Sequence, residues 1–196
     1  TIKGSTAPRG RILDVNGKVL VDNTGINTLL YNRTDRTARM SEVDIAYQLG
    51  EILQFDEKKF TTSKLKTFYM VKNDGCKDLI TEEEYQLYKE RKLTGSDLEA
   101  LKYDRITDEM LGTFSFEDRN ASHIYSILST GYYYEDKVIK KNLTDEEVVA
   151  INDLDLPGIR TDLTWERLYP YGDTLRSVLG TIRDEGLLSR ERDKFE

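Results

Sequence analysis

The sequence predicts an α+β fold in which a small antiparallel sheet region, built from both chain ends, flanks an inserted helical head. Three observations support this prediction. Runs prone to β structure surround an Asn-Gly dipeptide near the start, patterns that begin helices fill the middle, and β-prone runs return toward the end. We therefore expect a pedestal-like sheet subdomain from residues 1–33 and 132–196, and a helical head from residues 34–131.

Residues 9–21 predict a β-hairpin. Two short β-prone runs flank Asn16-Gly17, the dipeptide that best tolerates positive φ at both central positions of a tight turn. The run 26–32 is β-branched, aromatic or apolar at several positions, which predicts a third strand. The opening of the chain is therefore expected to be sheet.

The middle of the chain carries helix signals. Apolar residues at helical spacing after Ser41 predict a helix over about 42–54. Thr81 and Glu84 form a capping-box pattern, in which each side chain bonds the other residue's amide. Further helices are expected at 63–71, 81–88, 96–101, 107–111 and 116–128.

Strand patterns return in the last third of the chain. Residues 137–142 predict a strand, and Thr144 with Glu147 forms a second capping box that opens a helix through Ile151. Residues 156–170 predict another strand that ends at a proline. A short helix at 175–179, ending at Gly180, is expected to follow.

Composition excludes several classes of protein. The 196 residues carry a net charge of −7, with Lys and Arg interleaved among Asp and Glu, so a basic stripe that follows a nucleic-acid backbone is not expected. One cysteine, Cys76, excludes an intrachain disulfide, and one histidine, His123, excludes a Cys and His zinc cluster. No stretch approaches the roughly 18 to 20 apolar residues that span a bilayer, so any anchor is expected to lie upstream.

Ser63-Lys-Leu-Lys66 matches the S-x-x-K pattern, which in penicillin-recognising enzymes places a lysine one helical turn from a nucleophilic serine. Such a site also needs S-x-N and K-[ST]-G segments, and the sequence has neither. The segment around Ser63 is also highly charged. We therefore interpret the pattern as a helix surface.

Other reactive side chains are interpreted structurally. His123 has no neighbouring nucleophile motif, and Cys76 is taken as an incidental thiol. The acid clusters at 82–84 and 146–147 lie in predicted first helical turns, where the helix dipole favours negative charge. We predict no catalytic, cofactor-binding or metal-binding residues.

Aromatic residues gather at two places near the predicted sheet. The run Tyr132-Tyr133-Tyr134 suits a sugar-stacking platform, but packing over the sheet is favoured. The same two interpretations apply to Trp165, Tyr169 and Tyr171.

The run from Arg9 to Leu20 resembles the R-G-x-I-x-D-x-N-G-x-x-L signature at the start of the N-terminal pedestal of class B penicillin-binding proteins. Residues 167–170, Arg-Leu-Tyr-Pro, resemble the R-x-Y-P element of the same family. Residues 184–187, Asp-Glu-Gly-Leu, resemble the Gly-Leu or Gly-Ile pair that precedes the catalytic domain in family members. Val15, where many members have a polar residue, and a helical insert rich in Lys and Asp depart from the family pattern. The exact subfamily stays open.

The resemblance implies a non-catalytic, dimerisation-type pedestal of the Gram-positive type, with no cofactor. It implies an upstream transmembrane anchor that places the domain at the extracellular face of the cell membrane, and a downstream serine D,D-transpeptidase domain that β-lactams acylate. The implied partners are that domain and the elongation or division machinery, including a polytopic glycosyltransferase, with nascent peptidoglycan as a further candidate.

The residues expected to matter are structural: Arg9, Gly10, Asp14, Asn16, Gly17, Arg167, Tyr169 and Pro170. Arg9 and Asp14 are placed for ion pairs at a shielded junction. Our hypothesis is that Arg9 and Arg167 lock the two chain ends together through acids such as Asp14.

Two other functional classes stay open from the sequence. One is a stand-alone extracellular adhesion or sensor domain with the same fold. The other is an enzyme with an unfamiliar carboxylate site, which requires a deep cleft holding two acids of raised pKa.

Overall fold

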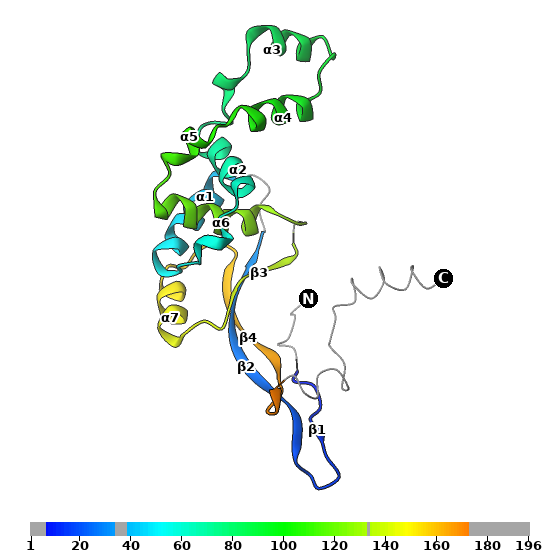
Figure 1. The fold of residues 1–196 in the computed structure, drawn as a ribbon. Coiled ribbons are helices and arrows are strands. Elements are labelled where there is room, and N and C mark those ends of the chain that lie inside the picture. The colour runs from blue at the N-terminus through cyan, green and yellow to red at the C-terminus, as the bar shows by residue number, and fades with distance from the viewer. Residues whose placement is uncertain (1–6, 34–38, 133, 173–196) are drawn as a thin grey trace, which may run out of the picture. The chain divides into compact units, whose positions relative to one another are not determined.

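The computed structural model describes residues 7–33, 39–132 and 134–172. Over these residues the chain has seven α-helices, two short 3-10 helices and a sheet of four strands, which confirms the α+β class (Figure 1). The chain groups into two compact units. Residues 7–26 and 163–172 are the described part of the first, here called the terminal unit, and residues 27–162 belong to the second, here called the helical unit.

These units differ in extent from the predicted subdomains of residues 1–33 with 132–196, and 34–131. Residues 27–33 and 132–162 group with the helices, because Leu29 and Tyr31 lie in a core that is formed mostly by helical side chains. The assignment of the sheet and the head to separate functional subdomains stays a prediction.

Strand β2 (Val19–Asn32) is the centre of the sheet. It pairs antiparallel with β1 (Ile12–Leu13) and with β3 (Asp136–Lys141), and it also pairs with β4 (Ile159–Leu168). Opposite residues run from Thr28 with Lys141 to Asn32 with Asp136 in the β2 and β3 pair, with a register shift between Leu29 and Leu30.

The prediction of separate strands before and after residues 22–24 is wrong, because β2 runs through them without a break. The polar residues there remain extended since Asn23 has partners on both neighbouring segments: its side chain donates to the carbonyl of Arg9 and accepts from Arg167.

The helices begin close to where the sequence predicts. Their bounds are α1 Arg39–Ile52, α2 Thr62–Lys72, α3 Glu82–Lys89, α4 Gly95–Arg105, α5 Asp108–Gly112, α6 Phe116–Ser129 and α7 Asp145–Asp153, with 3-10 turns η1 Glu57–Lys59 and η2 Lys77–Leu79. The capping boxes predicted at Thr81 and Thr144 are both formed. Two more, at Thr94 and Ser115, use aspartate as the acid at the third helical position.

The core of the helical unit forms around α6, which packs against α1, α2 and β3 (Figure 1). It is mostly apolar and fully covered at its centre. Its largest fully buried apolar side chains are Phe68, Leu29, Leu49, Leu53, Ile106, Ile124, Leu128 and Ile151. Helices α1 and α6 are joined by Asn120, whose amide group donates to the carbonyls of Gly50 and Leu53 and accepts from the Phe55 amide.

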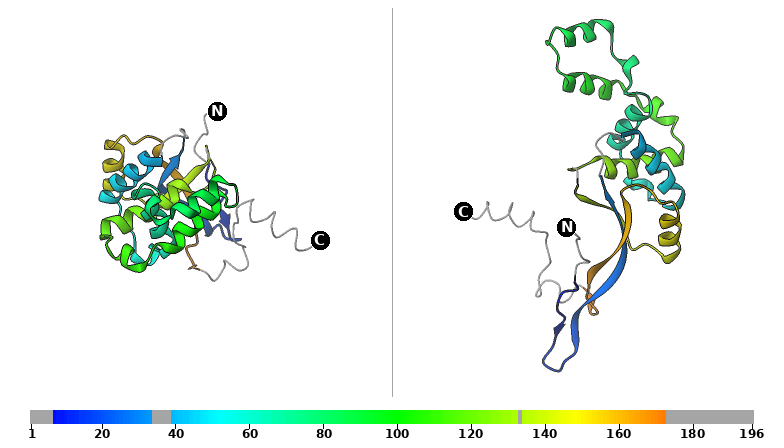
Figure 2. Two further views of the ribbon diagram at one scale, coloured as in Figure 1. Left: turned by 90° about the horizontal axis from the view of Figure 1, so that it is seen from above. Right: turned by 180° about the vertical axis from the view of Figure 1, so that it is seen from behind.

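Helix α3 has no buried residue and contacts α4. Both extend away from α6 in the two views from the side (Figures 1 and 2). Because α3 lacks an apolar anchor, its position depends on polar contacts with its neighbour.

Near the end of the described chain, the predicted strand 137–142, helix from 144 and strand 156–170 correspond to β3, α7 and β4. The predicted helix at 175–179 with Gly180, and the segment 184–187, lie outside the described residues. None of the helices in the described part of the chain is both long and apolar enough to cross a bilayer.

Candidate functional site: the junction of the chain ends

The hairpin turn of the terminal unit is organised by Asp14. Its carboxylate Oδ1 accepts the amides of Asn16 and Lys18, both at 2.8 Å, and its carbonyl accepts the Gly17 amide at 3.0 Å. Gly17 has a φ of +82°, and Asn16 is not among the described residues of positive φ. The expectation of positive φ at both residues is therefore wrong, because the turn is closed by the aspartate side chain and requires the left-handed conformation at the glycine alone.

Arg167 joins the two ends of the chain. Its Nη1 on β4 donates to the carbonyl of Gly10 at 2.6 Å and to Asn23 Oδ1 at 3.2 Å. Asn23 Nδ2 in turn donates to the carbonyl of Arg9 at 2.5 Å. One guanidinium and one amide thus fasten the segment before β1 to both β2 and β4. Hydrogen bonds from a charged donor are stronger than neutral ones, so Arg167 is the main polar fastening.

Two further contacts flank this fastening. Arg11 Nε lies 2.8 Å from Asp22 Oδ1, and Asp22 also accepts the amide of Asn23. The Asn23 amide, and after it Arg11, lowers the pKa of Asp22, so the carboxylate stays ionised. Lys18 Nζ lies 4.7 Å from the ring centroid of Tyr171, a cation–π contact between the hairpin and the end of the described chain.

The structure brings most of the predicted structural motif together. Asp14, Asn16 and Gly17 lie in the hairpin turn, and Gly10 lies just before β1, where its carbonyl accepts from Arg167. In the described contacts Arg9 takes part through its carbonyl, and Asp14 bonds turn amides. The described contacts between the chain ends therefore use the side chains of Arg167 and Asn23 and the carbonyls of Arg9 and Gly10, whereas our hypothesis used the side chains of Arg9 and Asp14. The side-chain role of Arg9 stays a prediction.

The remaining motif residues lie just past β4. Tyr169 is half-buried and its carbonyl accepts the Gly172 amide at 3.0 Å, and Pro170 is exposed. Sequence reasoning missed Asn23 and Asp22, since their polarity suggested a break between strands. The sequence did hold one signal for them. In a hairpin that turns at residues 14–17, Asp22 and Asn23 lie opposite the Arg-Gly-Arg run of residues 9–11.

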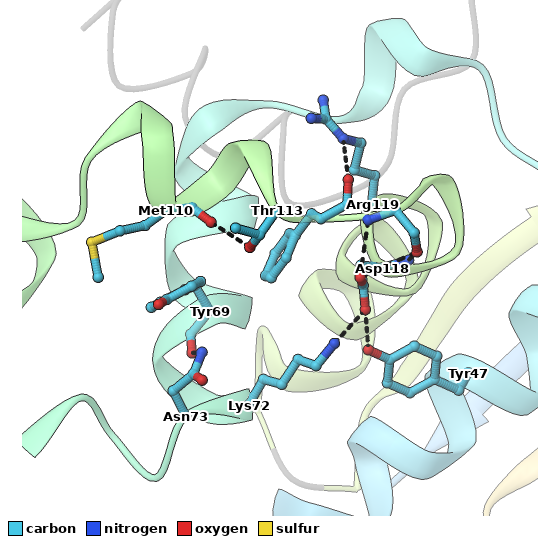
Figure 3. Close-up of polar contacts among 10 residues, drawn as sticks. Tyr47, Tyr69, Lys72, Asn73, Met110, Thr113, Asp118 and Arg119 are labelled. Carbon is cyan, nitrogen blue, oxygen red and sulfur yellow. Dashed lines mark hydrogen bonds and ion pairs between the residues drawn. The ribbon is translucent and has the colours of Figure 1, made fainter.

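A polar cluster in the helical unit joins three helices at the start of α6 (Figure 3). Asp118 Oδ1 accepts from Tyr47 Oη of α1 and from Lys72 Nζ of α2, both at 2.5 Å. Burial would raise the pKa of Asp118, but the bonds from Lys72 and Tyr47 outweigh it and the pKa is lowered. Burial and Asp118 raise the pKa of Tyr47. A satisfied, ionised acid of this kind positions helices and is poorly suited to proton transfer.

His123 on α6 is packed, as expected. Its Nδ1 accepts from Lys64 Nζ at 2.9 Å, and its ring meets Phe55 edge-on with centroids 4.6 Å apart. Burial, followed by the charges of Lys64 and Lys59, lowers the pKa of His123 to about 4. The imidazole is therefore neutral at physiological pH.

The S-x-x-K pattern does not form a nucleophilic site in this structure. Ser63 is exposed on the first turn of α2, while Lys66 Nζ donates to the carbonyl of Tyr103 at 3.0 Å and lies 4.9 Å from its ring centroid. Cys76 is buried, and its burial raises the pKa of the thiol. Both observations agree with the structural interpretation of these residues.

The packing interpretation of the tyrosine run is wrong for two of its members. Tyr132 and Tyr134 are 82% and 64% exposed, because the chain turns there and Tyr134 has a φ of +65°. Tyr133 lies outside the described residues. Trp165 and Tyr171 are also partly exposed, at 37% and 42%.

The carboxylate-enzyme alternative gains no support from a cavity of about 650 Å³ in the helical unit, whose lining includes Glu42, Asp74 and Glu99. Lys77 lowers the pKa of Asp74, the opposite of the shift that a catalytic acid needs. Within the ranges that the structure describes, no three His, Cys, Asp or Glu side chains are grouped as a metal site.

Known proteins of one family resemble this chain over almost its whole length. Residues 4–195 match the family model described as the penicillin-binding protein dimerisation domain. Penicillin-binding protein 2A of Bacillus subtilis is 32% identical over 97% of this chain, and penicillin-binding protein H of the same organism is 26% identical over 96%. The chain spans 28% and 31% of the length of these two relatives.

Solved structures show the same fold. Penicillin-binding protein 2B of Streptococcus pneumoniae strain 5204 matches 97% of this chain with a TM-score of 0.67 and 21% identity, and the chain covers 30% of that structure. The protein from strain R6 matches 93% of this chain with a TM-score of 0.66.

Proposed function

The chain belongs to the penicillin-binding protein dimerisation domain family, as the pedestal of a class B penicillin-binding protein, and we propose that it positions a transpeptidase domain during peptidoglycan synthesis. The matched part of the relatives is the non-catalytic domain, and their transpeptidase part lies outside it. The observation that carries the proposal is the match over residues 4–195. In the parent protein, a serine D,D-transpeptidase would crosslink stem peptides and be acylated by β-lactams.

The junction of the terminal unit supports a positional role. Arg167 and Asn23 fasten the segment before β1 to two strands, so residues far apart in sequence are held at one place. A fastening of this kind suits a domain that must present a neighbouring domain at a fixed orientation, since loose chain ends would transmit no orientation.

Location and partners form the finer part of the proposal. By analogy with the family, an upstream transmembrane helix would hold the domain at the extracellular face of the cell membrane. The pedestal would then contact elongation or division proteins, including a polytopic glycosyltransferase, with nascent peptidoglycan as another candidate. The exposed Tyr132 and Tyr134 are suitable for stacking on a sugar ring.

Labelling with fluorescent penicillin tests the proposal. This chain and the intact protein from its native cells would be labelled in parallel and separated by size. We expect that this chain is not labelled, and that the intact protein is labelled, is membrane-associated and is much longer. Labelling of this chain at Ser63 would overturn the non-catalytic assignment, and an unlabelled parent of similar length would favour the stand-alone adhesion or sensor domain.

A further inference from the structure

The hairpin turn of the terminal unit presents an asparagine side chain to solvent. Asn16 and Gly17 are both exposed, and Val15 beside them is 98% exposed. Among the described residues nothing bonds the Asn16 carboxamide, although Asp14 accepts the Asn16 backbone amide. A Cβ added at Gly17 would meet nothing within 4 Å. The turn therefore places a free carboxamide next to the one residue type that has no side chain.

An asparagine amide before glycine is chemically reactive, because the backbone nitrogen of the next residue can attack it. The Gly17 nitrogen loses its proton to water and bonds Asn16 Cγ, while the bond from Cγ to the side-chain nitrogen breaks. That nitrogen takes up a proton and leaves as ammonia, so a cyclic imide remains. Water then opens the ring at either carbonyl, which gives aspartate or an isoaspartate whose backbone runs through Cβ. Water is the only other reactant.

The turn restrains this reaction through Asp14. The Gly17 amide donates to the Asp14 carbonyl at 3.0 Å, and the Asp14 carboxylate accepts the amides of Asn16 and Lys18, both at 2.8 Å. While the first of these bonds is made, the Gly17 amide keeps its proton and points at Asp14. The turn must therefore open before the nitrogen can attack, and the contacts of Asp14 control how often it opens.

The sequence and the structure make Asn16 different from the other asparagines. It is the only asparagine of the chain that precedes a glycine. Asn73 is also exposed, but its side chain donates to the Tyr69 carbonyl at 2.8 Å, and the next residue, Asp74, has a Cβ that hinders attack. Asn120 is buried and its amide group makes three hydrogen bonds. The reaction should therefore be selective for Asn16.

We propose that Asn16 is a site of spontaneous deamidation, which the Asp14 contacts slow and which loosens the terminal unit when it occurs. Isoaspartate adds Cβ to the backbone between residues 16 and 17, so the Gly17 amide no longer meets the Asp14 carbonyl in the same register. Either product also places a second negative charge near the Asp14 carboxylate, and like charges repel. The site does not depend on the transpeptidase role of the parent, because it requires only the hairpin.

Incubation of this chain in mildly alkaline buffer, followed by trypsin digestion and mass spectrometry, tests the site. Trypsin releases residues 12–18, in which Asn16 is the only asparagine, and residues 73–77, which contain Asn73. We expect Asn16 to deamidate at least about tenfold faster than Asn73. Asn16→Gln lengthens the side chain and should remove the signal from residues 12–18. Equal rates at Asn16 and Asn73 would overturn the proposal. Isomerisation at Asp74 leaves the mass unchanged and is therefore not counted.

A synthetic peptide of residues 12–18 tests the restraint by the turn. It has the same sequence but no stable hairpin, so it should deamidate at least about tenfold faster than the folded chain. Asp14→Ala should speed the reaction in the folded chain by about tenfold and leave the rate in the peptide nearly unchanged. The same effect of Asp14→Ala in chain and peptide, or no effect in the chain, would overturn the role of Asp14.

Amide exchange before and after conversion measures the loosening. We expect exchange in residues 12–21 to be faster in the deamidated chain, with no change in the amides of α6. The Asn16→Gln chain, incubated in the same way, is the control and should keep its original exchange rates. Unchanged exchange in residues 12–21 after conversion would overturn the proposed loosening.

Discussion

Arg105 at the end of α4 holds Glu84 in the first turn of α3 with both arms of its guanidinium, at 2.6 and 2.7 Å. The same carboxylate closes the capping box by accepting the amide of Thr81. Arg105, and then the Thr81 amide, lowers the pKa of Glu84 to about 2. One acid thus begins a helix and attaches it to its neighbour.

Glu84→Gln should loosen α3 while leaving the core intact. The amide side chain preserves size but loses the charge that both partners require. We expect amide exchange in residues 82–89 to accelerate about tenfold, with no change in the amides of α6. Glu83→Gln, in the same turn without a described contact to Arg105, serves as the control. Unchanged exchange in α3 would show that the bidentate contact is dispensable.

Gly158→Ala should destabilise the helical unit severely. Gly158 has a φ of +75°, its carbonyl accepts the Asn32 amide, and an added Cβ would collide with the Asn32 carbonyl oxygen. We expect a loss of at least about 3 kcal/mol in urea unfolding. Gly75→Ala shares the positive φ but meets only the flexible end of Lys102, so it should lose about 1 kcal/mol. Equal losses would contradict the steric argument.

Asn120→Ala should be among the most damaging polar substitutions. It removes three hydrogen bonds and leaves the carbonyls of Gly50 and Leu53 and the amide of Phe55 without this buried partner. The expected loss is about 3 kcal/mol, measured as the shift in the urea midpoint. The exposed Asn73, which donates to the Tyr69 carbonyl, provides the control, and Asn73→Ala should cost less than about 1 kcal/mol.

Stability should fall as the pH drops from about 6.5 to about 4. The folded pKa of His123 is about 4 against 6.5 for an ordinary histidine, so in this window the unfolded chain binds a proton that the folded chain does not. The contribution is complete above pH 6.5 and should decrease by about 2 kcal/mol by pH 4.5.

Urea unfolding at closely spaced pH values measures this effect. His123→Gln removes the titration but keeps a group that accepts from Lys64, so its profile should be flatter in the same window. His123 is the only histidine of the chain, which makes the comparison specific. Identical slopes for the two chains would assign the pH dependence to other groups.

Arg167→Ala should loosen the terminal unit. The Gly10 carbonyl and Asn23 lose a charged donor, and we expect a cost of about 1 to 2 kcal/mol. Amide exchange across residues 9–23 is the measurement, because it reports on this unit alone. Arg9→Ala should have a much smaller effect, since the described contact of Arg9 uses its carbonyl. A larger effect of Arg9→Ala would restore the ion-pair hypothesis.

Local rules predicted the helices well. The helix starts at Thr81 and Thr144 depend on contacts between residues three positions apart. The residues that determine each start therefore lie within one helical turn and can be recognised from the sequence. The capping boxes at Thr94 and Ser115 went unrecognised since aspartate replaces the usual glutamate.

The course of β2 could not be predicted from local patterns. Residues 22–24 are polar, and they stay extended because of partners at Arg9 and Arg167, the second of which lies more than a hundred residues away. The fastening of Arg167 to the Gly10 carbonyl was equally hidden. The acceptor is a backbone carbonyl, which every residue has, so the residue type at position 10 does not indicate this hydrogen bond.

Burial of Cys76 has a practical consequence for measurements on this chain. The covered thiol, whose pKa is raised by burial, is expected to react slowly with maleimides, which attack thiolates. Val15 at the hairpin tip is 98% exposed, so a cysteine introduced there would take a fluorophore selectively. The chain should therefore accept a single dye without removal of its native thiol.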